Sequence, residues 1–113
     1  MVVMLRGVWD YIPRIQYIKY RGYTTKIVKT NLGYLCGYVL LPKSFKLNVE
    51  WYDLGIVHGG ITYHEGNVIG FDCAHYMDYI PALNIGEVYN YKDVDFVNNE
   101  LRMLVNTLIG MNK

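Results

Sequence analysis

The chain has little of what would indicate a secreted, membrane-bound or nucleic-acid-coating protein. Its two cysteines, Cys36 and Cys73, are too few for a disulfide framework. No apolar run approaches the ~18–20 residues that span a bilayer, and residues 1–6 are too short for a secretory signal. The net charge of +1 argues against broad binding of long nucleic acids, which needs a basic stripe. We therefore expect a cytoplasmic protein with reduced thiols and no membrane or long nucleic-acid partner.

Length and composition predict one α+β domain over residues 1–113. The 52% hydrophobic and 19% charged content is typical of a folded chain. Alternating residues over 14–20 and β-branched residues over 23–30 predict a hairpin, and the apolar run 34–41 predicts a central strand covered on both faces. Residues 1–13 could form an edge strand or a short turn.

A second hairpin is expected from Ile56–Tyr63 and Val68–Ala74, with a turn centred on Glu65-Gly66. Residues 43–55, which carry Trp51, Tyr52 and Asp53, and residues 76–92 have no clear periodicity and are expected to be loops. Asp53 and Asp78 are interpreted as ordinary loop acids.

A C-terminal helix is the third expectation, capped by Asp93 and ended by Gly110. The predicted fold is a compact antiparallel sheet of about five strands packed against this helix. The apolar stripe that would face the sheet recurs at helical spacing: Val94, Val97, Leu101, Leu104, Val105 and Leu108.

The second hairpin also contains the residues that could carry chemistry. If His64 faces Asn67 across the turn, His58 faces Cys73, His75 lies diagonally on the same face, and Asp72 points to the other face. Such a cluster could bind zinc, with Cys36 as a fourth ligand, or form a thiol–imidazole pair. No CxxC or HExxH motif accompanies it, so a structural histidine beside a buried thiol is favoured and no cofactor is predicted.

Three glycines, Gly59, Gly60 and Gly70, weaken the predicted strands, which leaves two interpretations. They could form a shallow ligand-binding depression, or they could make room for a bulge or a large core side chain. The ligand interpretation predicts contacts from His58, Gly59, Gly60, Thr62, Tyr63, Asp72 and His75.

The chain resembles a family of small phage and prophage proteins with no settled biochemical role. The resemblance rests on Cys36-Gly37-Tyr38-Val39, on residues 57–63 and 70–75, and on Tyr91-Lys92-Asp93, and it covers about residues 20–108. The chain departs from the family at Tyr76-Met77. The resemblance implies a phage origin and no particular reaction. Phages carry small accessory proteins that blunt host immunity, several of them by sequestering nucleotide messengers, and by this analogy an anti-defence role in the host cytoplasm is compatible with the chain.

Three functional hypotheses follow. The first is a non-enzymatic protein that binds a small nucleotide-like ligand, with some of the twelve tyrosines stacking on its base. The second is a metal- or thiol-dependent hydrolase that uses His58, Cys73 and His75. The third is a protein–protein inhibitor that uses the tyrosine-rich loops. A homo-oligomer is also expected, because oligomers are common among proteins of this kind.

Overall fold

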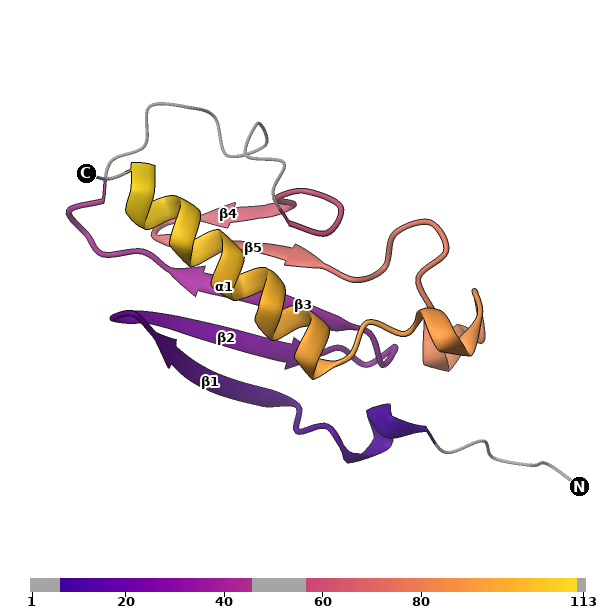
Figure 1. Cartoon of the computed structure of the whole chain (residues 1–113). Coiled ribbons are helices and arrows are strands. Elements are labelled where there is room, and N and C mark those ends of the chain that lie inside the picture. Colours follow the sequence, from indigo (N-terminus) through magenta and orange to yellow (C-terminus); the bar gives the residue numbers. More distant parts are fainter. Residues whose placement is uncertain (1–6, 46–56, 112–113) are drawn as a thin grey trace, which may run out of the picture.

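The computed structural model describes residues 7–45 and 57–111. The fold has two layers, a five-stranded antiparallel sheet and one long helix (Figure 1). The predicted α+β fold is confirmed. Of the loop expected over 43–55, the part that carries Trp51, Tyr52 and Asp53 lies outside the described residues. The elements are η1 (Val8–Tyr11), β1 (Ile15–Tyr20), β2 (Tyr23–Lys29), β3 (Leu35–Leu40), β4 (Tyr63–Glu65), β5 (Val68–Asp72), η3 (Pro81–Leu83), η4 (Val88–Asn90) and α1 (Val94–Met111).

The first three strands form a meander, and the first predicted hairpin is confirmed. β1 and β2 are joined by Arg21 and Gly22, which both have positive φ angles, 51° and 84°. A two-residue turn of this kind matches the natural twist of paired strands. Of residues 1–13, the structure describes 7–13, and these add no edge strand, because Val8–Tyr11 is a short 3-10 helix.

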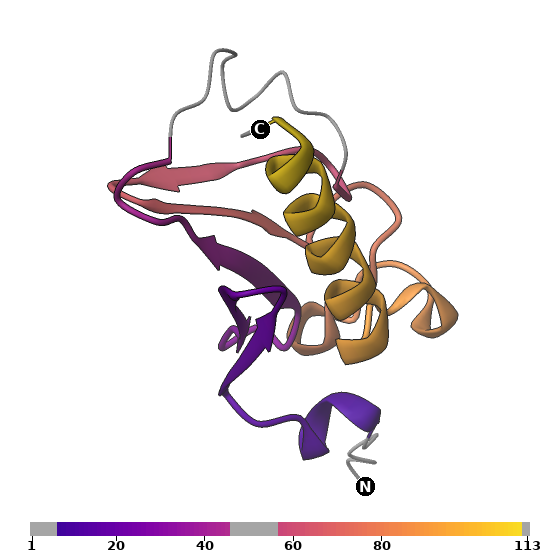
Figure 2. The same ribbon diagram turned by 60° about the vertical axis from the view of Figure 1, so that its left-hand side comes forward.

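The core lies between the sheet and α1, which contacts β3 and β2 (Figure 2). Ile27, Val39 and Phe71 are buried from the sheet side. Asp93 caps the helix as predicted, because its Oδ1 accepts a hydrogen bond of 3.0 Å from the Phe96 N–H. The predicted helix stripe supplies the other half of the core, with Val97, Leu101, Leu104, Val105 and Leu108 buried and Val94 partly buried.

Two details of these predictions are wrong. The helix continues through Gly110 to Met111, so Gly110 does not end it. Within the described residues, the central strand β3 is fully covered only on the face toward α1, where Leu35 and Val39 are fully buried. On the opposite face Cys36 is buried, whereas Tyr38 and Leu40 are half-buried. Apolar residues on both faces of a strand indicate a central position, and they do not guarantee a second covering layer.

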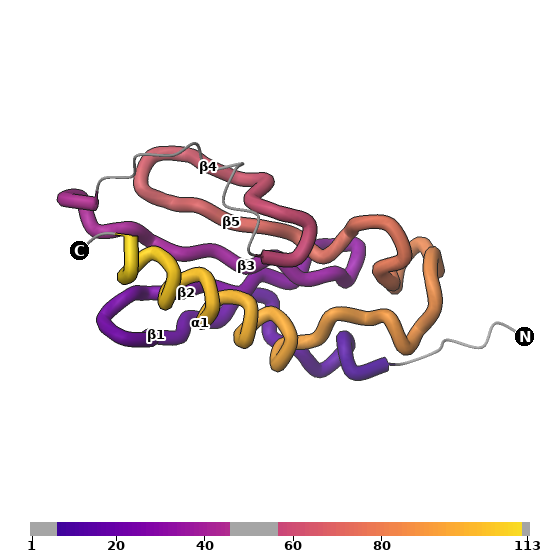
Figure 3. Tube along the Cα trace, turned by 45° about the horizontal axis from the view of Figure 1, so that its top comes forward, coloured from indigo at the N-terminus to yellow at the C-terminus, as the bar shows by residue number. Residues whose placement is uncertain are grey.

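The second hairpin is shorter than predicted and has a different register. β5 lies between β3 and the three-residue edge strand β4 (Figure 3). The turn is Gly66-Asn67, with Gly66 at φ +59° in its first central position, as a type II′ turn requires. Residues 57–62 are therefore a loop, and His58 does not face Cys73. The pairs are Tyr63↔Gly70, His64↔Ile69 and Glu65↔Val68.

The expected loop after β5 contains two short 3-10 helices, η3 and η4. An isolated antiparallel β-bridge joins Ile80 to Ile85 within this loop. The Tyr79 hydroxyl donates a 2.8 Å hydrogen bond to Asn84 Oδ1. The loop therefore has a defined conformation. Over the described ranges, no helix combines the length and apolarity needed to cross a membrane.

Candidate functional site

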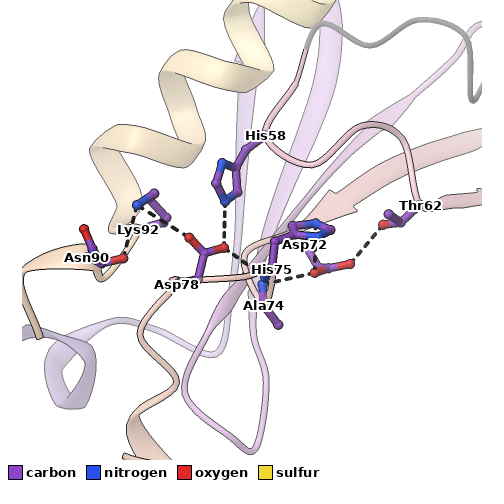
Figure 4. A network of polar contacts seen from close by, with 8 residues as sticks. All are labelled: His58, Thr62, Asp72, Ala74, His75, Asp78, Asn90 and Lys92. Carbon is purple, nitrogen blue, oxygen red and sulfur yellow. Dashed lines mark hydrogen bonds and ion pairs between the residues drawn. The ribbon is translucent and has the colours of Figure 1, made fainter. Parts of the chain in front are cut away.

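Asp78 is the centre of a polar network that joins the loop before β4, the loop after β5 and the start of α1 (Figure 4). Its side chain is only 2% exposed, and its Oδ2 lies 2.6 Å from His58 Nε2. The same oxygen accepts a hydrogen bond of 3.0 Å from the His75 backbone N–H. Lys92 Nζ lies 3.5 Å from Oδ1. A buried carboxylate needs such donors to offset its desolvation, and here they come from three separate segments.

Asp72 holds the second half of the network. Its Oδ2 accepts a 3.0 Å hydrogen bond from the Thr62 hydroxyl, and its Oδ1 accepts one of 3.1 Å from the Ala74 N–H. His75 Nε2 lies 3.3 Å from Oδ1, an ion-pair distance, but the nitrogen is buried and its orientation satisfies no hydrogen bond within the described residues. The prediction that Asp72 points away from both histidines is wrong. The chain leaves β5 after Asp72 and turns back, which brings the His75 side chain next to the Asp72 carboxylate.

The two histidines lie together, although not by the predicted strand pairing. Their ring centroids are 5.5 Å apart with the rings edge to face, and His58 also meets Phe96 of α1 edge-on at 5.3 Å. Both histidine side chains are partly exposed, at 22% and 30%. The network therefore presents two fixed imidazoles at the surface, each beside a carboxylate.

Two of the three glycines accommodate protein side chains. Gly59 has φ +71°, and a β-carbon there would overlap the His75 ring; a β-carbon at Gly70 would overlap the Tyr38 ring. Gly60, at φ +82°, faces open space. Of the two interpretations left open by the sequence, room for a large side chain describes Gly59 and Gly70, and only Gly60 adjoins free volume.

The thiols lack the properties of nucleophiles or metal ligands. Cys73 is 1% exposed within the core, where burial, and then the neighbouring Asp78 carboxylate, raise the pKa of its thiol. Burial also raises the pKa of Cys36. Reactive cysteines need the opposite shift and access. No group of three or more His, Cys, Asp or Glu side chains is placed to hold a metal ion in residues 7–45 and 57–111, so His58, Cys73 and His75 do not form a metal site there.

The seven predicted ligand residues divide between two places. His58, Gly59, Thr62, Asp72 and His75 lie in the network or against it, with Gly60 next in the same loop. Tyr63 instead lies on the open face of the sheet, where its hydroxyl donates a 3.0 Å hydrogen bond to Glu65.

Sequence reasoning missed Asp78 and Lys92, the two charged residues that join the network to the helix. No periodicity marks either residue, and Asp78 resembles any other acid in a loop. The one local signal is the spacing His75-x-x-Asp78, which allows a carboxylate to accept a hydrogen bond from a backbone N–H three residues earlier.

Comparisons of the chain with protein-family models, curated proteins and solved structures find no match. The function of the network must therefore be argued from its own geometry and chemistry.

Proposed function

We propose that the chain is a non-catalytic binding protein for a small nucleotide-like ligand, with His58 and His75 as the central contacts. The observation that carries the proposal is the way in which Asp78 fixes both histidine-bearing loops, through the His58 ring and the His75 backbone. Fixed polar groups at a partly exposed surface bind a ligand at low entropic cost.

The donor inventory favours an anionic ligand. The Asp72 and Asp78 carboxylates already accept hydrogen bonds or ion pairs from the protein, and these use the Thr62 hydroxyl proton and the His58 Nε2 atom. Lys92 pairs with Asp78 and donates to the Asn90 carbonyl, so its ammonium has a third N–H for a ligand, beside the Nδ1 atoms of the two imidazoles. Phosphate oxygens accept from such groups.

Binding without turnover agrees with the chemistry of the site. A thiol-dependent hydrolase would need an accessible thiolate, whereas burial raises the pKa of the Cys73 thiol. Because the chain resembles small phage and prophage proteins, the proposed setting is the cytoplasm of an infected host, where sequestering a nucleotide messenger would blunt defence.

Native mass spectrometry and calorimetry with cyclic nucleotides and ADP-ribose derivatives test the proposal. We expect one of these nucleotides to be retained chemically intact, and His58→Gln to weaken its binding by about tenfold, as loss of a good hydrogen bond does. His64→Gln, in β4 and outside the network, is the matched control and should bind as the unaltered chain does. Absence of binding across the panel refutes the proposal, and a cleaved product would favour the hydrolase.

A second candidate function is the inhibition of a partner protein through the loop 76–90. Six large apolar side chains of this loop are 51–95% exposed, and the Ile80–Ile85 bridge holds its backbone. An exposed apolar loop of this kind is a candidate protein-binding surface. They are Tyr76, Met77, Leu83, Ile85, Val88 and Tyr89.

A pull-down from host lysate tests this second candidate. Tyr76→Asp with Tyr89→Asp should abolish capture of a specific partner while nucleotide binding persists, because these tyrosines lie outside the histidine network. Capture that is unaffected by the double substitution would exclude the loop as the binding surface.

A further inference from the structure

One cross-strand row runs over all five strands on the sheet face that α1 does not cover. Tyr17 pairs with Lys26, Lys26 with Tyr38, Tyr38 with Gly70, and Gly70 with Tyr63. The Tyr38 ring occupies the space over Gly70 and meets the Tyr63 ring edge-on at 5.3 Å. Lys26 Nζ lies 5.9 Å from the ring centroids of both Tyr17 and Tyr38. The row is therefore an aromatic band with one embedded cation.

This band lies on an accessible, apolar surface. Tyr17 is 63% exposed, Ile15 52% and Tyr63 40%. In the view of Figure 2 the helix lies on the other side of the sheet. Monomeric proteins seldom leave a contiguous apolar face of this kind in water. A shallow depression of about 390 Å³ follows the band and is lined by Tyr17, Lys26, Val28, Tyr38, Leu40, Tyr63 and Val68.

A neighbouring row on the same face carries opposite charges at its two ends. It pairs Lys19 with Thr24, Thr24 with Leu40, Leu40 with Val68, and Val68 with Glu65. Lys19 and Glu65 are both exposed and lie on the outer strands β1 and β4, while Leu40 lies midway between them on β3. This row is therefore positive at one edge, negative at the other and apolar at its centre.

We propose that this face binds a second copy of the chain, sheet to sheet. The two copies would be related by a two-fold axis that lies in the interface between the sheets, parallel to β3. Rotation about this axis exchanges the two edges of the sheet. It places Lys19 over Glu65 of the other copy, Tyr17 over Tyr63, and Leu40 over Leu40. The alternative in-plane axis, across the strands, would place Lys26 over Lys26 and is disfavoured by charge repulsion. Self-complementarity of this kind is what an isologous dimer requires.

The dimensions of the sheet allow this contact. Packed sheets cross at about 30°, and β1 lies about 10 Å from the axis. The crossing therefore shifts β4 of the other copy by only about 5 Å from exact alignment over β1, which is within the reach of a lysine side chain. Five strands of this length project roughly 400–500 Å² per copy. The total is close to the ~1,000 Å² that separates specific interfaces from incidental ones, so the dimer should form in a concentration-dependent manner.

Sedimentation velocity over a hundred-fold range of protein concentration tests the proposal. We expect a monomer–dimer equilibrium, which Lys19→Glu or Glu65→Lys alone should each weaken by roughly tenfold, because each breaks two symmetry-related pairs. The double variant Lys19→Glu with Glu65→Lys should restore the dimer. Glu100→Lys is the control for Glu65→Lys: it makes the same charge change but lies on α1, on the other side of the sheet, and should leave the dimer unchanged.

Three results would refute the dimer. One is a monomer at every concentration, and another is a dimer that neither single reversal weakens. The third is a double variant that fails to recover while circular dichroism shows it to be folded. If the monomer instead binds a labelled single-stranded oligonucleotide through Tyr17, the aromatic band stacks bases and the occupant of the face is not a second copy.

Discussion

Gly59 and His75 are in such close contact that a β-carbon on Gly59 would overlap the imidazole ring. We predict that Gly59→Ala destabilises the protein by about 2–4 kcal/mol, because it both strains a backbone at φ +71° and displaces His75. Chemical denaturation measures this loss.

Gly60→Ala separates these two causes. Gly60 has a similar φ, +82°, but nothing lies within 4 Å of the added carbon. Its substitution should cost only the backbone strain, about 1 kcal/mol. Equal losses for the two variants would show that the His75 contact contributes nothing.

Asp78→Asn should be among the most damaging conservative substitutions in the chain. It removes a buried charge from His58 and Lys92, and we expect a loss of about 2–4 kcal/mol in the free energy of unfolding. Asp72→Asn, at a carboxylate that is 30% exposed, should cost within about 1 kcal/mol. Denaturant titrations of both variants give the comparison, and a larger loss for Asp72→Asn would contradict the central position of Asp78.

Asp93→Ala should shorten or fray the start of α1. Its carboxylate accepts a hydrogen bond from the Phe96 N–H, and loss of such a cap costs about 1 kcal/mol. Asp95→Ala, in the first turn of the same helix, loses only an interaction with the helix dipole and should cost about 0.5 kcal/mol or less. Thermal unfolding followed by circular dichroism distinguishes the two variants.

Stability should fall as the pH rises above about 9, the region in which a free thiol loses its proton. Because burial raises the pKa of Cys73, the native state keeps this proton after the unfolded state has released it. Its contribution is therefore complete below that pH and is lost above it, with a slope of up to about 1.4 kcal/mol per pH unit. The Cys36 thiol, whose pKa burial also raises, adds a dependence of the same sign.

Cys73→Ala should reduce this alkaline slope by up to about 1.4 kcal/mol per pH unit and leave the part due to Cys36. Ile69→Val loses core packing without losing a titrating group, so it should lower stability equally at every pH. Urea unfolding between pH 8 and about 10 measures the slopes, and an unchanged slope in Cys73→Ala would contradict the burial argument.

The sheet and the helix could be predicted because their signals are local. Strand alternation over residues 14–20 and the stripe from Val97 to Leu108 each arise from one face of one element, and the structure confirms both. The second hairpin failed at a single turn. Placing Gly66 in the second rather than the first central position shifts the register, and the predicted opposition of His58 and Cys73 disappears with it.

The candidate site could be predicted only in part, because loops assemble it. The sequence indicates His58, Asp72 and His75 by residue type, but their contacts depend on how two loops fold over one another. Asp78 becomes important only once it is buried against both loops and Lys92. The sequence pattern contains no signal of that burial.

The Asp78 network also bears on local unfolding. Because one carboxylate is bonded to the loop 57–62, the loop 73–79 and Lys92, none of these segments can open without breaking a bond shared with the others. The amides of both loops and of the first turn of α1 should therefore exchange with deuterium at similar rates, as one cooperative unit that is separate from the β1–β2 hairpin.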